Sequence, residues 1–135
     1  MAKTAYSAIV LSPESHNQLL STCRDKIPQG WEALCHHVTI KMGELPLELK
    51  ASIGLPVKLT ATFFHADDKV MAVQVEVPGE LRPFIKNTHP HITVAVNRNN
   101  GGKPMMSNAL IASNPTGGEL IGSLNLMGQI QEVPQ

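Results

Sequence analysis

Two short stretches of the sequence each place a histidine and a threonine two positions apart, among β-branched residues. They are His37-Val38-Thr39 and His91-Ile92-Thr93. In a strand, side chains at i and i+2 leave the same face of the sheet, so each histidine points with its threonine. Val38 and Ile92 then point to the opposite face, into a core. Two such strands side by side would bring two imidazoles and two hydroxyls into one groove.

These groups together suit the cleavage of a phosphodiester. Imidazole serves as either base or acid near neutral pH, and threonine hydroxyls can donate to the non-bridging phosphate oxygens. No carboxylate cluster and no His/Cys metal-ligand spacing lies near either stretch, so we expect a reaction without metal or cofactor. His37 and His91 are the candidate catalytic residues, and Thr39 and Thr93 the candidate phosphate-binding residues. The sequence leaves open which histidine is the base and which the acid.

Composition and charge limit the partners of the chain. Its 135 residues, 42% hydrophobic and 16% charged, predict one folded domain over residues 1–135. Eleven Lys and Arg balance eleven Asp and Glu, so no net field attracts a long duplex. A nucleotide, a cyclic oligonucleotide or a short RNA end is the more natural partner. Two cysteines without metal spacing indicate free thiols, and the lack of an apolar targeting or spanning segment predicts a cytoplasmic protein without membrane contact.

The hydrophobic pattern predicts the elements that position the two motifs. Ser12-Pro13-Glu14 combines a capping residue with a proline in the first turn and so predicts a helix start. Alternation at 57–64 and 70–77, joined by a polar link, predicts a hairpin. Strands interleaved with few helices predict an α+β fold with a mostly antiparallel sheet. We expect strands at 4–11, 33–42, 57–64, 70–77, 89–96 and 119–133, and helices at 13–26, 45–53 and 104–112.

The two motifs resemble those of the two-histidine phosphoesterase superfamily. The order of the chain most resembles the cyclic phosphodiesterase domain of plant and fungal tRNA ligases. The matching residues are Trp31, the stretches 37–39 and 90–93, Lys103 and Ser107-Asn108.

This resemblance implies a bilobed, mostly antiparallel α+β fold with a central groove and outer helices, in which His37 and His91 act as acid and base and Thr39 and Thr93 hold the phosphate. Substrates of the superfamily include RNA ends with a 2′,3′-cyclic phosphate, ADP-ribose cyclic phosphate, 2′,5′-oligoadenylates and cyclic oligonucleotide messengers. The chain lacks ligase and kinase domains, so we expect a stand-alone hydrolase.

Four further side chains are candidates for substrate contact. Trp31 can stack on a base, although a lone tryptophan more often anchors a core. Tyr6 can reach the groove through its hydroxyl unless it is buried. His89 shares a face with the second motif histidine, and Lys103, after two glycines, either contacts a phosphate or simply ends a turn.

Two interpretations remain open at this point. The groove either hydrolyses a nucleotide phosphodiester or holds a nucleotide or RNA end without cleaving it, as a sequestering module would. A third interpretation, two hydrogen-bonded histidines inside a sheet without a ligand, fits poorly with the polar faces of both strands. His36 alternates to the face opposite His37, so we expect it to be structural.

Overall fold

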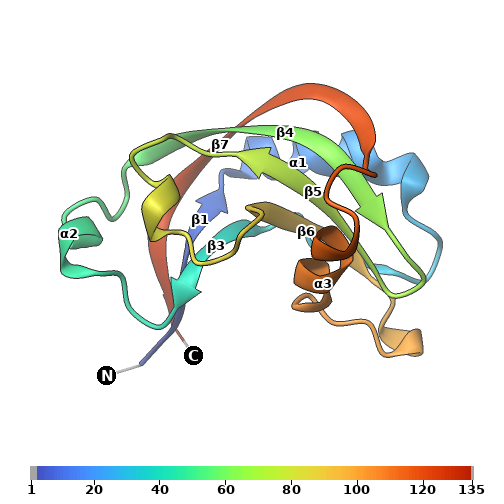
Figure 1. The fold of residues 1–135 in the computed structure, drawn as a ribbon, viewed down its shortest axis with the longest axis horizontal. Helices are drawn as coiled ribbons and strands as arrows, with labels where there is room; N and C mark the ends of the chain where they lie inside the picture. The colour runs from blue at the N-terminus through green and yellow to red at the C-terminus, as the bar shows by residue number, and fades with distance from the viewer. Residues whose placement is uncertain (1–2, 135) are drawn as a thin grey trace.

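The computed structural model describes residues 3–134, which form one antiparallel sheet that curls until its edges meet (Figure 1). The strand order is β2-β6-β3-β1-β7-β4-β5, and β5 also pairs with β6, so six of the described strands form a closed, barrel-like ring. The predicted α+β fold with a mostly antiparallel sheet is therefore confirmed. The strands are β1 (Thr4–Leu11), β2 (Glu32–Ala33), β3 (His37–Met42), β4 (Pro56–Ala66), β5 (Val70–Glu76), β6 (His91–Val96) and β7 (Glu119–Pro134).

Helices pack against the strands of this ring. The helix start predicted at Ser12 is confirmed, because the Ser12 hydroxyl oxygen accepts a hydrogen bond from the Ser15 backbone N–H at 3.2 Å. Leu19 and Cys23 carry the buried side of the first helix into the core. The helices and helical turns are α1 (Pro13–Cys23), η1 (Arg24–Lys26), α2 (Leu47–Lys50), η2 (Arg82–Phe84), η3 (Arg98–Asn100) and α3 (Met106–Ser113). The helix predicted at 45–53 is thus a single turn, followed by turns that end at Gly54.

The long strand β7 ties the ring together, because it pairs with β4 along one part and with β1 along the other. At the overlap Gly128 lies so close to β1 that a Cβ atom would meet the Ile9 Cγ2 atom at 2.7 Å. Only glycine allows this approach. The fit holds β1 firmly between β7 and β3, and β1 carries Tyr6.

The two strands with the His-x-Thr motifs are neighbours, as expected, but they pair over a very short length. Their register contains the single pair Val38–Ile92, after which the strands diverge. Val38, Ile40, Ile92 and Val94 are at most 1% exposed. The apolar residues therefore face the core, and the histidines and threonines face the other side, as the alternation predicts.

The strand predicted at 33–42 is interrupted, and this part of the prediction is wrong. β2 ends at Ala33 and β3 begins at His37, because Cys35 adopts a left-handed backbone with φ of 51°. Its N–H donates to the Thr93 carbonyl at 3.1 Å, and its buried Sγ atom lies 3.7 Å from the Val94 carbonyl oxygen. These contacts hold a conformation that non-glycine residues seldom adopt. The break changes the direction in which the His36 side chain points.

Candidate active site

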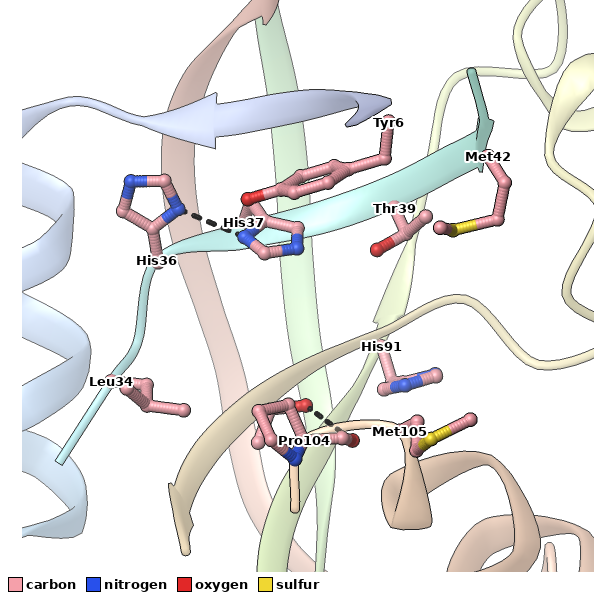
Figure 2. A pocket seen from close by; sticks show the side chains of 10 residues that line it. Tyr6, Leu34, His36, His37, Thr39, Met42, His91, Pro104 and Met105 are labelled. Atoms are coloured by element: carbon pink, nitrogen blue, oxygen red, sulfur yellow. Dashed lines mark hydrogen bonds between the residues drawn. The ribbon is translucent and has the colours of Figure 1, made fainter. Parts of the chain in front are cut away.

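A cavity of about 400 Å³ opens on the polar side of β3 and β6, where the two strands diverge (Figure 2). All four motif residues line it, together with residues from β1, from the break before β3 and from the segment before α3. The lining residues are Tyr6, Leu34, His36, His37, Thr39, Met42, His91, Thr93, Pro104 and Met105. The structure thus brings the predicted catalytic and phosphate-binding candidates into one place.

His91 is held by the backbone of its own strand end. Its Nδ1 atom lies 2.8 Å from the His89 carbonyl oxygen. A carbonyl only accepts hydrogen bonds, so Nδ1 carries the hydrogen and Nε2 of the neutral ring keeps a free lone pair. Burial lowers the pKa of His91, and the hydrogen bond to His89 opposes this only in part. At neutral pH His91 is therefore an unprotonated imidazole whose free nitrogen is a base.

His37 is held by two aromatic side chains. Its ring stacks on Tyr6 at a centroid distance of 4.8 Å and an angle of 30°. Its Nδ1 atom lies 2.8 Å from Nδ1 of His36, with the two rings at 84° to each other. Burial, and then the neighbouring His36 and His91, lower the pKa of His37 to about 4. A neutral ring is consequently the resting form at physiological pH.

The two threonine hydroxyls have different surroundings. Thr93 Oγ1 lies 2.9 Å from the buried Ser107 hydroxyl and 3.3 Å from the Pro104 carbonyl oxygen. The Thr93 hydrogen can turn from that carbonyl to a ligand oxygen while Ser107 continues to donate to Oγ1. Thr39 has no side-chain hydrogen bond to any residue in the range 3–134, so its hydroxyl is free for a ligand. Both hydroxyls can donate to phosphate oxygens.

The antiparallel register places the two imidazoles at opposite ends of the site. Val38 pairs with Ile92, so the next positions set His37 opposite Thr93 and Thr39 opposite His91. The histidines lie on one diagonal and the threonines on the other. An in-line displacement at phosphorus needs its base and its acid on opposite sides of the reacting atom. The diagonal supplies that arrangement, with a donor on each remaining side.

His36 does not lie on the face opposite His37, as strand alternation predicted, and this expectation is corrected. The left-handed Cys35 ends the alternation before it reaches position 36. As a result His36 is exposed, lines the cavity and contacts the ring of His37. A break held by tertiary hydrogen bonds leaves no signal in a pattern of residue types, so the adjacent pair of histidines was the only cue.

The four candidates for substrate contact fall in different places. Tyr6 lines the cavity through its stack on the first motif histidine. His89 supplies its carbonyl to the second motif histidine, and its side chain borders a smaller depression of about 220 Å³ beside Lys86. Trp31 packs partly buried against the core, and Lys103 is exposed; neither lines the cavity.

The apolar walls of the cavity are not evident from the sequence. Met42 and Met105 are 74% and 73% exposed although both are large and hydrophobic. Figure 2 places these two side chains at one end of the cavity and Leu34 near the other. Exposed thioethers beside the polar candidate catalytic groups suit a flat apolar ligand part such as a nucleobase. Nothing in local periodicity distinguishes them from core methionines.

Two further features bear on the kind of site and protein. Within residues 3–134, no three His, Cys, Asp or Glu side chains lie together in a way that could hold a metal ion. No helix in that part of the chain has the length and apolar character needed to cross a membrane.

An antiparallel α+β fold with two His-x-Thr strands around one cavity defines the class of the two-histidine phosphoesterases. Comparison with family models matches residues 14–131 to the fungal tRNA ligase phosphodiesterase domain. The match spans most of the chain, and the chain belongs to this family. Membership confirms the resemblance drawn from the motifs and implies a cyclic phosphodiesterase activity. A search of curated proteins gave no match.

Proposed function

We propose that the protein is a metal-independent phosphodiesterase that hydrolyses a nucleotide phosphodiester, with an RNA end bearing a 2′,3′-cyclic phosphate as its first candidate substrate. One observation carries the proposal: two imidazoles and two hydroxyls from paired strands line a single cavity, and the Nδ1 atom of each imidazole is occupied by a hydrogen bond. The family match to a tRNA ligase phosphodiesterase domain supports the RNA end. ADP-ribose cyclic phosphate, 2′,5′-oligoadenylates and cyclic oligonucleotides remain candidates through the same chemistry.

The tautomer of His91 favours one assignment of roles. His91 keeps its hydrogen on Nδ1, so its bare Nε2 takes a proton from the attacking water. His37 then gives the proton from its own Nε2 to the leaving ribose oxygen, and a terminal phosphate forms. Thr39 and Thr93 donate hydrogen bonds to the two non-bridging oxygens, where charge increases in the transition state. General acid–base catalysis of this kind supplies on the order of 10²- to 10⁴-fold in rate.

The cavity also supports a limited substrate size. A volume of about 400 Å³ lies within the range of roughly 300–1,000 Å³ that suits a small ligand such as one nucleotide. Among the ten described residues that line it there is no lysine or arginine. With zero net charge on the chain, a long polyanion finds little attraction here. The recognised part is therefore the end of an RNA or a compact nucleotide.

Product analysis by mass spectrometry tests the proposal. The protein is incubated in EDTA with RNA ending in a 2′,3′-cyclic phosphate, nucleoside 2′,3′-cyclic phosphates, ADP-ribose cyclic phosphate, 2′,5′-oligoadenylate and cyclic oligonucleotides. We expect cleavage of at least one substrate by the wild type and none by His37→Asn or His91→Asn. Tight binding without cleavage would instead identify a sequestering module, and cleavage by both variants would contradict the proposal.

A further inference from the structure

The two proposed catalytic imidazoles have partners of different chemistry. Nδ1 of His91 faces a backbone carbonyl, which can accept a hydrogen but never supply one. Nδ1 of His37 faces Nδ1 of His36, another imidazole nitrogen, which can do either. Two N–H groups or two lone pairs would repel at 2.8 Å, so one hydrogen is shared between these two nitrogens.

We propose that His36 is a positioning residue that holds the tautomer of His37 and supplies the proton that replaces the one delivered to the leaving oxygen. This inference rests on the proposed function, in which the first motif histidine is the general acid. His36 donates its Nδ1 hydrogen to the bare Nδ1 of His37. That bond requires the hydrogen of a neutral His37 to be on Nε2, the nitrogen available to the substrate.

The placement of the two rings fits such a relay. Figure 2 shows the second ring nitrogen of His37 facing the cavity and that of His36 facing away from it. His36 is exposed, so it can exchange protons with bulk water, whereas His37 is partly buried beneath Tyr6. A chain of three groups therefore leads from solvent through two imidazoles to the leaving oxygen.

The proton steps balance without any other reactant. Nε2 of His37 loses its hydrogen to the leaving oxygen, the Nδ1 hydrogen of His36 crosses to Nδ1 of His37, and the exposed Nε2 of His36 takes a proton from solvent. His36 is then neutral, and the hydrogen bond between the rings has reversed direction. After product release, water returns a proton to Nε2 of His37, the shared hydrogen moves back to Nδ1 of His36, and Nε2 of His36 releases its proton to solvent. Meanwhile His91 releases to solvent the proton that it took from the attacking water.

The relay also explains how the buried His37 ring can act as an acid although it is rarely protonated. With a pKa of about 4, only roughly one His37 ring in 1,000 is protonated at pH 7. A lone imidazolium at this place would rarely be available. A neutral ring that receives a hydrogen on one nitrogen as it loses one from the other needs no stable imidazolium at the buried position.

A comparison of leaving groups tests the proposal. A nucleoside 2′,3′-cyclic phosphate expels an alkoxide that needs a proton, whereas a p-nitrophenyl nucleotide diester expels a stable phenolate that does not. We expect His36→Ala to lower kcat by about 10- to 100-fold on the cyclic phosphate and less than about threefold on the nitrophenyl diester. An equal loss on both substrates, or no loss on either, would overturn the proposal.

Two matched variants separate supply of a proton from simple orientation. Asn at position 36 can place a side-chain N–H near the former Nδ1 atom and hold His37, but it cannot relay a proton. We expect His36→Asn to remain slow on the cyclic phosphate, and full rescue by it would reduce His36 to an orienting role. In a His37→Asn background, His36→Ala should cause no further loss, because its effect passes through His37.

A measurement without turnover keeps this test separate from that of the proposed function. In protein with ¹⁵N-labelled histidine, two-bond ¹H–¹⁵N correlation spectra report which ring nitrogen carries the hydrogen. We expect His37 to carry it on Nε2 in the wild type and to show a different tautomer balance in His36→Ala. A hydrogen on Nδ1 of wild-type His37 would overturn the proposal even in an active enzyme. The expected tautomer in a protein that cleaves no substrate would instead count against the proposed function alone.

Discussion

Strands β3 and β6 carry the same His-x-Thr pattern, yet the structure treats them differently. His91 is fixed by a backbone carbonyl, and its threonine is fixed by Ser107 from α3. His37 is fixed by the side chains of His36 and Tyr6, and its threonine has no partner among the described residues. On β6 the histidine is held by the backbone, whereas on β3 it is held by two other side chains. This difference in surroundings is why we propose different roles for the two repeated motifs.

The largest effect is expected when each histidine is replaced by asparagine. We expect His91→Asn to lower kcat by about 10³-fold on both a cyclic phosphate and a p-nitrophenyl diester, because both reactions need the base. His37→Asn should show a comparable loss on the cyclic phosphate alone, since nitrophenolate needs no acid. Steady-state kinetics on the two substrates measure this. The reverse pattern would exchange the roles of the two strands.

A second test concerns stability and pH. In the folded chain the pKa of His37 is about 4, below the ordinary 6.5, so between these values the unfolded chain binds a proton that the folded chain does not. The contribution of His37 is thus complete above about pH 6.5 and falls as the pH drops toward 4. The His37 ring is faced by Tyr6, His36 and His91. The lowered pKa of His91 also makes the folded chain less stable as the pH drops.

From pH 7 to pH 5 we expect the free energy of unfolding to fall by about 1 to 2 kcal/mol through His37. Because the ring is partly exposed, solvent screening reduces the effect of the pKa shift on stability. Urea unfolding at both pH values measures this in the wild type, His37→Gln and His91→Gln. The loss should be smaller in His37→Gln than in His91→Gln. An unchanged loss in His37→Gln would show that the ring titrates normally.

The threonines provide a smaller contrast. Thr39→Val and Thr93→Val each remove one donor to the phosphate and should lower kcat/KM by about tenfold. Ser107→Ala should cost only about threefold, because it frees the Thr93 hydroxyl without deleting it. Kinetics of the three variants on one cyclic phosphate give the comparison. A loss in Ser107→Ala as large as that in Thr93→Val would make Ser107 a substrate contact rather than a support.

The smallest expected effect comes from the aromatic stack. Replacement of Tyr6 by leucine opens the His37 ring to water, which should raise the pKa of His37 toward its ordinary value and change kcat only a few-fold. An NMR titration of the His37 ring protons measures the shift. No comparable change should occur at His91, which Tyr6 does not stack on. Equal shifts at both rings would indicate a general loosening of the fold.

Much of the fold could be predicted from the sequence because local rules govern it. Alternation placed Val38 and Ile92 in the core and their histidine neighbours on the other face, and the cap at Ser12 placed α1. The hairpin of β4 and β5 followed from two alternating runs. In each of these cases short-range residue pattern and long-range packing agree.

The rest of the site depends on tertiary contacts that no local pattern contains. The backbone of Cys35 turns left-handed because β6 holds its N–H and thiol, and that turn brings His36 into the cavity. Met105 reads as a core methionine, yet the position of α3 leaves it at the rim. Trp31, a candidate from the resemblance, packs on the core instead. The motifs thus predicted four of the residues that line the cavity, but not the residues around them.

The most direct test of joint action by His37 and His91 is a comparison of single and double variants in ¹⁸O-labelled water. For wild type in EDTA with RNA ending in a 2′,3′-cyclic phosphate, we expect a terminal phosphate that carries one ¹⁸O atom. His37→Asn, His91→Asn and the double variant should be similarly slow, because an acid and a base that act on one bond fail as a unit. Wild-type turnover in either single variant, or losses that multiply in the double variant, would contradict a shared reaction at this site.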